Sequence, residues 1–296
     1  FGIYKEYLMR EIKNFIHLTR LNKPIGFILL FWPCSWGLSL AYKENGDLNT
    51  LVYFLALFFL GSVLMRSAGC IVNDIVDKDL DKKVKRTKNR PIASGAVSMR
   101  RGFIYVFLLC ALAFLILIQF NKITIILGLC SMILAFSYPF MKRLTYWPQL
   151  FLGLTFNWGA VMAWTSLTGY ISLEIAILYI AAIFWTLGYD TIYGAQDIED
   201  DEIIGVKSTS IKFKKNLKLF VVCSYLITLS LLIYIFSKSF GLNLLTIMIL
   251  AFFISLIYQI KIFETKKPQT CMRAFKANGI SGLLLFLGIL SNSMIL

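Results

Sequence analysis

Long uninterrupted apolar segments are the feature that most constrains the fold of this 296-residue chain. Each is about 17 to 25 residues long, the length that crosses a lipid bilayer as an α-helix. Hydrophobic residues make up 58% of the chain, more than in an ordinary globular domain. Because a helix satisfies its own backbone hydrogen bonds within lipid, the sequence predicts an all-α, multi-pass membrane protein.

Nine membrane-spanning helices are expected, and no boundary between them separates a second domain. We therefore treat residues 1–296 as one transmembrane domain. The predicted spans are 25–42, 51–72, 102–120, 123–140, 149–168, 172–195, 217–236, 241–261 and 278–296.

The positions of the positive charges support this count and give an orientation. If the N-terminus is cytoplasmic, only Lys43, Lys122 and Lys238 fall in outside loops, and Arg66 alone lies within a span. The other 26 of the 30 lysines and arginines then lie in or beside the cytoplasmic segments. Such an asymmetry is what the positive-inside rule predicts, so the C-terminus is expected on the opposite side.

The stretch GCIVNDIVDKDLDKKVKRTKNRPIASG, residues 69–95, places an acidic and then a basic block at the end of a span. If the helix continues through this stretch, Asn73, Asp77 and Asp81 lie within about 80° of one another on the helical wheel. Asp74 lies at the edge of the same stripe, and Asp79 points away. The helix would therefore present one row of oxygen ligands.

A second acidic stretch, YDTIYGAQDIEDDE, occupies residues 189–202 and also lies at a predicted cytoplasmic helix end. On a continuous helix Asp190, Asp197 and Asp201 lie within about 40° of one another. Tyr193 lies near this stripe and Glu199 on the opposite face. The pattern of the first stretch is thus repeated about 120 residues later.

The chemistry of these side chains indicates a hard divalent cation. His17 is the only histidine, and carboxylate and amide oxygens without softer ligands select Mg²⁺. Because Mg²⁺ usually binds protein carboxylates together with substrate phosphates, two facing stripes suggest a diphosphate between them. Arg86 and Arg90 in the basic block could bind its remaining oxygens. Solvated helix ends are the alternative, and the repetition of the stripe argues against it.

Three further cations have two interpretations each. Arg66 lies about two turns before Asn73 on nearly the same face, where it could pair with Asp190 or bind an anionic acceptor. Lys142 and Arg143 fall in a short inside loop, where topology alone could explain them.

Motifs in this chain resemble the UbiA superfamily of intramembrane prenyltransferases. LMRSAGCIVNDIVDKDLDKKVKRTKNRPIASGAVS is similar to the first motif of that family, NDxxDxxxD, and GYDTIYGAQDIEDDEIIGVKST to the second, DxxYxxxDxxxD. SYPFMKRLTYWPQLFLG and LTRLNKPIGFILLFWP look most like the 4-hydroxybenzoate polyprenyltransferases of ubiquinone biosynthesis. The resemblance extends from about Leu18 to Ser210.

The resemblance implies a bundle of nine transmembrane helices around a central cavity that opens laterally to lipid, with Mg²⁺ as cofactor. It makes Arg143 a residue that binds substrate or diphosphate, and Asp74, Asp190 and Tyr193 further motif positions. The implied metal–diphosphate ligands are Asn73, Asp77, Asp81, Asp197 and Asp201.

The implied reaction is transfer of a polyprenyl group from polyprenyl diphosphate to the 3-position of 4-hydroxybenzoate, with release of diphosphate. Haem O synthases and menaquinone prenyltransferases share the motifs and are the alternatives within the family. A cation-coupled transporter is the alternative outside it, although transporter acids tend to lie near the bilayer midplane. The expected location is a bacterial plasma membrane or an organelle inner membrane, with the active site on the cytoplasmic side and no nucleic-acid partner.

Overall fold

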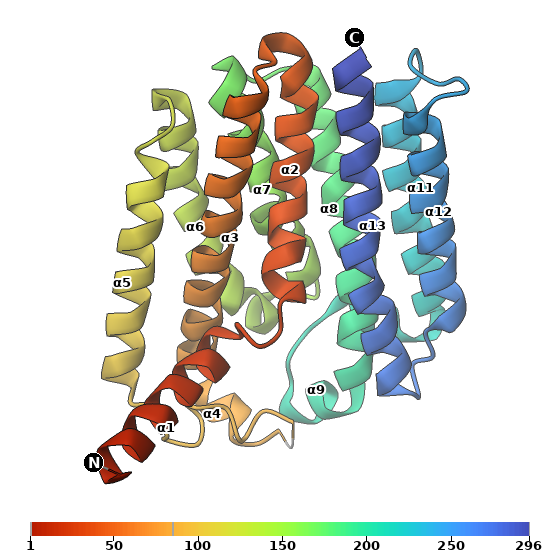
Figure 1. Cartoon of the computed structure of the whole chain (residues 1–296). Helices are drawn as coiled ribbons and strands as arrows, with labels where there is room; N and C mark the ends of the chain where they lie inside the picture. The colour runs from red at the N-terminus through yellow and green to blue at the C-terminus, as the bar shows by residue number, and fades with distance from the viewer. Residues whose placement is uncertain (1, 85, 296) are drawn as a thin grey trace.

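The computed structural model describes residues 2–84 and 86–295, and this part of the chain is helical without any β-strand. Figure 1 shows long helices standing side by side, with the first and last helices reaching opposite ends of the bundle. The helices are α1 (Gly2–Thr19), α2 (Ile25–Asn45), α3 (Leu48–Val76), α4 (Lys78–Asp81), α5 (Met99–Leu117), α6 (Lys122–Leu144), α7 (Pro148–Thr168), α8 (Leu173–Gly194), η1 (Ala195–Asp197), α9 (Ile198–Ile204), α10 (Thr209–Lys212), η2 (Lys214–Asn216), α11 (Leu217–Phe236), α12 (Leu244–Ile262) and α13 (Pro268–Ile295).

Within the described residues, nine helices are long and apolar enough to cross a membrane, which confirms the predicted number. The largest boundary difference is in α13, which begins at Pro268 rather than at residue 278. The first turns of α13 carry the charged residues Arg273 and Lys276, so hydropathy alone did not assign these turns to the span. The sequence also did not predict α1, a charged helix that lies across the lower end of the bundle.

Several helices begin where a short polar side chain satisfies the free backbone N–H groups of the first turn. Asp47, Ser98, Asn121, Ser172 and Asn243 cap α3, α5, α6, α8 and α12 in this way. These residues lie between apolar segments, so the caps fix the points at which the chain turns back into the membrane.

The centre of the bundle is α2, which packs against α3, α7 and α13. Gly37 permits the closest approach, since a Cβ there would lie 2.2 Å from the carbonyl oxygen of Ala160 on α7. On the other side of the molecule α8 packs against α11, and α12 against α13. Two groups of helices therefore meet along α2, α7, α8 and α13.

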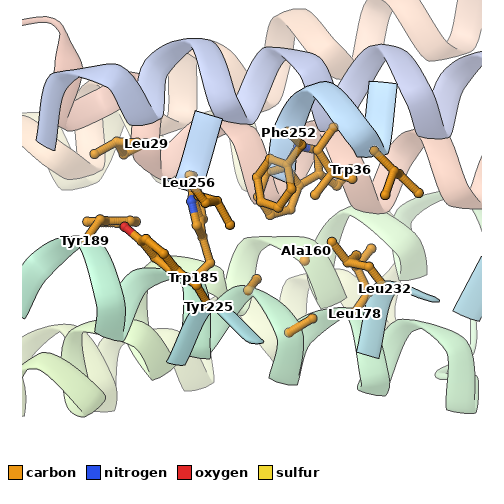
Figure 2. Packing of buried hydrophobic residues seen from close by; sticks show 14 of the residues in the cluster. Leu29, Trp36, Ala160, Leu178, Trp185, Tyr189, Tyr225, Leu232, Phe252 and Leu256 are labelled. Atoms are coloured by element: carbon orange, nitrogen blue, oxygen red, sulfur yellow. The ribbon is translucent and has the colours of Figure 1, made fainter. Parts of the chain in front are cut away.

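A large apolar core fills this junction, and Figure 2 shows part of it around Trp36, Trp185 and Phe252. The rings of Trp36 and Trp185 have centroids 5.0 Å apart. Such aromatic packing contributes to stability through both area and ring geometry. This core holds α8, which carries the second acidic cluster, against α2 and α13.

A buried polar network crosses the same core. The Tyr225 hydroxyl donates to Gln259 Oε1 at 2.7 Å, and Asn278 Nδ2 donates to the same oxygen at 2.9 Å. Trp185 Nε1 donates to Asn278 Oδ1 at 2.8 Å. Because lipid and apolar side chains offer no alternative partners, these bonds fix the register of α8, α11, α12 and α13.

Candidate functional site

A cavity of about 1630 Å³ opens between the helices and extends from the charged end of the bundle into its apolar interior. One wall is a stripe of residues along α3 that begins at Leu57 and ends at Asp77, directly after the helix; it is about 30 Å long at 1.5 Å per residue. Nearly all the site residues predicted from the sequence lie on the cavity wall, and only Arg143 is not part of it. Those on the wall are Arg66, Asn73, Asp74, Asp77, Asp81, Arg86, Arg90, Lys142, Asp190, Tyr193, Asp197 and Asp201.

The first acidic cluster lies at a break between two helices. The predicted continuous helix through Asp81 is wrong, because α3 ends at Val76 and α4 begins at Lys78. Asp77 occupies the break, with its N–H bonded to the carbonyl of Asn73. The side-chain directions nevertheless follow the wheel, since Asp77 and Asp81 are buried and Asp79 is 86% exposed.

Two arginines hold the buried carboxylate of Asp74. Arg20 donates two hydrogen bonds of 2.8 Å to it, and Arg90 donates at 3.2 Å. Arg90 also donates to Asp81 at 2.9 Å. Arg20 adopts a left-handed backbone conformation, with φ of 61°, which costs about 1–3 kcal/mol in a non-glycine residue. The bidentate pair with Asp74 compensates for that strain, so Asp74 positions the loop after α1.

The carboxylate of Asp77 is held by the end of α6. Lys142 donates to Asp77 Oδ2, and Arg143 donates to Asp77 Oδ1 at 3.4 Å and to the carbonyl of Val76 at 2.7 Å. The prediction that these cations lie in a loop is wrong, because α6 continues to Leu144. Extension of the helix by one turn carries both cations to the break between α3 and α4.

The second cluster also lies where a helix is interrupted. A 3₁₀ turn, η1, separates α8 from α9, so the predicted continuous stripe is wrong in its helical geometry. Asp190, Asp197 and Asp201 still line the same cavity, while Glu199 is exposed. Arg86 donates two hydrogen bonds to Asp197, at 2.9 and 2.8 Å. This pair joins the basic segment after α4 to η1, the turn that follows α8.

Two lysines at the cavity wall, Lys23 and Lys276, have side-chain ammonium groups without an ion pair or hydrogen bond within the described residues. Burial, and then the charges of four neighbouring cations, lower the pKa of the Lys23 ammonium; the four are Arg20, Arg86, Arg90 and Lys276. An excess of positive charge that lowers the pKa of a lysine in this way also favours the binding of an anion.

Arg66 is a third unpaired cation, and it lies deeper in the cavity. Its Nε is buried without a hydrogen-bond partner, and its guanidinium lies 5.3 Å from the ring centroid of Phe156. No direct ion pair joins it to Asp190 in the described part of the chain, although the two charges lie close enough to interact electrostatically. Tyr138 lies close enough to interact electrostatically with both groups, and Tyr193 with Arg66. Tyr189 also lines this region, and its hydroxyl is buried without a partner.

Sequence reasoning missed several residues of this site, namely Arg20, Lys23, Tyr138, Tyr189 and Lys276. Arg20 and Lys23, which precede α2, were counted only among the charges that set the topology. The sequence does not indicate that Arg20 contacts Asp74, because this contact depends on the left-handed backbone conformation of Arg20. The tyrosines look like any aromatic residue of a span, and only their place beside Arg66 and Asp190 distinguishes them.

The acidic residues fit a hard cation by their chemistry rather than by a preformed ligand cage. Among residues 2–84 and 86–295 no three acidic, histidine or cysteine side chains converge closely enough to hold an ion. The carboxylates of Asp77, Asp81 and Asp197 are instead paired with basic side chains. All are oxygen donors facing one cavity, a ligand set suited to Mg²⁺ shared with a phosphate.

The same architecture is found in solved structures of other proteins. Two solved structures share the fold: a UbiA homolog from Aeropyrum pernix K1 in its apo form, and a UbiA homolog from Archaeoglobus fulgidus bound to GPP and Mg²⁺. The first is 24% identical, with a TM-score of 0.73 over 88% of this chain and 96% of that one. The second is 20% identical, with a TM-score of 0.71 over 94% and 99%.

Curated relatives are more similar in sequence. The mitochondrial 4-hydroxybenzoate polyprenyltransferase of Arabidopsis thaliana is 49% identical over 216 residues, which are 73% of this chain and about half, 53%, of that relative. The enzyme of the same name from Bos taurus is 41% identical over 286 residues, covering 96% of this chain and 76% of the relative. The model of the UbiA prenyltransferase family matches residues 30–288. With this match, these relatives and the shared fold, the chain belongs to the UbiA prenyltransferase family.

Proposed function

We propose that this protein transfers a polyprenyl group from polyprenyl diphosphate to the ring of 4-hydroxybenzoate, in ubiquinone biosynthesis, with Mg²⁺ as cofactor. One observation carries the proposal: a single cavity joins two walls of oxygen donors, three unpaired cations and a long apolar interior. These features correspond to a metal-bound diphosphate, an anionic acceptor and an isoprenoid tail. The relatives named for this activity support the choice of acceptor.

The diphosphate would lie between the breaks in the two acidic helices. Asn73, Asp77 and Asp81 on one wall, with Asp197 and Asp201 on the other, would hold Mg²⁺. The bound metal would supply positive charge that favours departure of the diphosphate. Lys23 and Lys276 have no acidic partner among the described residues, so they are free to bind phosphate oxygens. Lys142, Arg143 and Arg86 would exchange their carboxylate partners for phosphate.

The acceptor would lie deeper, beside Arg66. A guanidinium binds a carboxylate through two parallel hydrogen bonds, and the unpartnered Nε of Arg66 is one donor suited to that task. Asp190 also forms no ion pair in the described part of the chain. It could therefore accept the phenolic proton of an acceptor held by Arg66, and so raise the electron density of the ring.

The remainder of the cavity would house the isoprenoid and protect the reaction. Cleavage of the allylic C–O bond leaves a carbocation, which the ring carbon ortho to the phenol attacks before that carbon loses its proton. Water would capture the cation, so its exclusion by apolar walls is part of the chemistry. Phe156 lies beside Arg66 on this wall, and its π face could also stabilise a nearby cation.

The protein is an integral membrane protein with several spans, and we propose that the charged end of the cavity faces the cytoplasmic side. The distribution of lysine and arginine supports this orientation. A bacterial plasma membrane or an organelle inner membrane would satisfy the same rule.

The test is a prenyl-transfer assay with the purified protein in lipid nanodiscs, using a polyprenyl diphosphate, 4-hydroxybenzoate and Mg²⁺. We expect a product whose mass equals the acceptor plus the prenyl group, with substitution at the 3-position, and no product after chelation with EDTA. If the protein gives no product under conditions in which a relative does, the proposal is wrong.

A further inference from the structure

The first helix, α1, differs from the long helices of the bundle because it lies across their charged end rather than beside them (Figure 1). Three of its apolar side chains are exposed: Leu8 to 48%, Met9 to 64% and Ile12 to 50%. We call these three residues the apolar face of α1. Large apolar side chains that gather on one exposed surface mark a site of contact with a membrane or with another protein.

Contacts with α5 fix the depth of α1 relative to the membrane. Glu11 forms an ion pair of 3.0 Å with Arg101, and Phe15 packs edge-to-face against Tyr105, with ring centroids 5.1 Å apart. Leu18 is buried in a cluster with residues of α3 and α5. Arg101 is the last charged residue before the apolar part of α5, so it marks the boundary between lipid headgroups and hydrocarbon. The middle of α1 therefore lies at that boundary.

The side chains of α1 form three faces around the helix axis. One face, centred between Glu11 and Phe15, contacts the bundle. At 100° per residue, the apolar face is centred about 90° from it, and a polar face about 210° from it. The polar face consists of Glu6, Arg10 and Lys13, all of them exposed. A helix with one side on the bundle, the next apolar and the next charged has the pattern of one that lies in a membrane surface.

The charge of α1 favours an anionic surface. Apart from the acid that is paired with α5, the helix carries Lys5, Arg10 and Lys13 against Glu6. Lys5 lies in the same sector as the apolar face, where its stem can follow acyl chains while its ammonium contacts headgroup phosphates. Basic residues at a membrane surface are attracted to anionic lipid. A second copy of the chain is the competing occupant, and the like charges of two such helices would oppose that contact.

The end of α1 is joined to the acidic end of the cavity. Arg20 follows the helix directly and donates two hydrogen bonds of 2.8 Å to Asp74. The backbone N–H of Lys23 donates to the carbonyl of Arg20 at 2.8 Å, so both cations belong to one short connection. Asp74 follows Asn73 directly and comes three residues before Asp77. A shift of α1 would therefore move two basic side chains relative to the acidic cluster.

We propose that α1 lies in the membrane surface at the charged end of the bundle, with its apolar face among acyl chains and its cations on anionic lipid headgroups, and that this contact holds Arg20 against Asp74. The lipid surface is then a partner that sets the geometry of one end of the cavity. This contact does not depend on which substrates the cavity binds.

The first test identifies the occupant of the apolar face. The photoreactive residue p-benzoylphenylalanine replaces Leu8 or Ile12 on that face and, in matched controls, Glu6 or Lys13 on the polar face. Each full chain is irradiated in liposomes of phosphatidylglycerol and phosphatidylcholine. We expect a several-fold higher yield of lipid adducts from the apolar face than from the polar face. Equal yields from the two faces, or cross-links from the apolar face to a second copy of the chain, overturn the proposal.

The second test measures the effect of lipid charge on α1 and on the connection after it, without turnover. Hydrogen exchange is followed by mass spectrometry in nanodiscs of phosphatidylglycerol or phosphatidylcholine. The wild-type protein is compared with two triple variants, each of which loses three positive charges. The α1 variant carries Lys5→Gln, Arg10→Gln and Lys13→Gln. The control carries Lys215→Gln, Lys261→Gln and Lys266→Gln, at exposed lysines of η2, α12 and the turn before α13.

We expect phosphatidylglycerol to slow exchange several-fold in α1 and at residues 20–23, in the wild-type protein and in the control. The α1 variant should lose this difference between the two lipids. A wild-type protein that exchanges equally in both lipids, or an α1 variant that keeps the difference, overturns the anionic-lipid contact. Slower exchange that is confined to α1, with no change at residues 20–23, overturns the link to Asp74.

Discussion

Replacement of Arg66 by methionine should separate binding of the acceptor from stability of the fold. Methionine keeps an unbranched apolar stem but removes the guanidinium. If Arg66 binds the acceptor carboxylate, the variant loses a hydrogen-bonded interaction with a charged group, about 1.5–3 kcal/mol. Converted at 1.36 kcal/mol per factor of ten, this is a fall of about 10- to 150-fold in kcat/KM for 4-hydroxybenzoate.

The stability of the same variant should not fall. Arg66 has no ion pair in the described part of the chain and a buried Nε without a partner. Desolvation of such a charge costs several kcal/mol, and the contact with Phe156 returns only about 0.5–2 kcal/mol. We therefore expect the thermal unfolding midpoint in detergent to be unchanged or higher. Arg20→Met is the matched control, because it removes both bonds to the buried Asp74 and should lower the midpoint.

The assay compares 4-hydroxybenzoate with phenol, which lacks the carboxylate, in the wild-type protein, Arg66→Met and Arg66→Lys. Transfer to phenol should be slow in all three and nearly independent of residue 66, whereas Arg66→Lys should retain part of the preference for the carboxylate. Two results would refute the reasoning. Arg66→Met could reduce transfer to both acceptors equally, or it could destabilise the protein as strongly as Arg20→Met does.

Three further predictions concern the charged end and the core. Asp77→Asn should lower kcat/KM at least about 100-fold in the transfer assay by removing a predicted metal ligand, and Asp79→Asn, at an exposed position of the same stretch, should not; equal effects would contradict the site. Burial and neighbouring cations lower the pKa of Lys23, and a bound anion would raise it. The affinity for diphosphate should therefore be greatest at pH values below the pKa of Lys23 in the ligand-free protein, and it should fall as the pH rises through that pKa. In a titration of binding against pH, Lys23→Arg should extend that affinity to higher pH, and an unchanged profile would exclude Lys23 from the phosphate site. Gln259→Leu should destabilise the fold by about 1–3 kcal/mol, since it leaves the Tyr225 hydroxyl and the amide of Asn278 without their shared acceptor; a thermal midpoint equal to that of the wild-type protein would show that the network adds no stability.

The side-chain directions of the acidic residues could be predicted because they depend on local geometry. A helical period places Asp77 and Asp81 together and Asp79 away, and a short break at Asp77 does not reverse this arrangement. The number of spans followed from hydropathy for the same reason, since each apolar segment is long enough by itself. Side-chain direction and the number of spans depend on residues close in the sequence, so small errors in the predicted helix boundaries did not change them.

Properties set by distant contacts could not be predicted. Arg86 and Asp197 are 111 residues apart, and nothing near either residue identifies the other as its partner. The contact between Arg20 and Asp74 depends on a single left-handed residue. Gln259 and Asn278 did carry a usable signal, because a polar side chain in an otherwise apolar span seeks a partner on another helix. That signal indicates the need for a partner but not which residue supplies it.

The distribution of paired and unpaired charges gives the site its asymmetry. At the helix breaks the carboxylates of Asp77, Asp81 and Asp197 already have cationic partners, which compensate part of the negative charge in the free protein without metal. Within residues 2–84 and 86–295, Lys23, Arg66 and Lys276 have no anionic partner, and their charge is left for ligands. When Mg²⁺ and a diphosphate bind together, the carboxylates and their former basic partners would both be satisfied. We therefore expect metal and diphosphate each to strengthen binding of the other, because either alone would leave part of the exchanged charge without a partner.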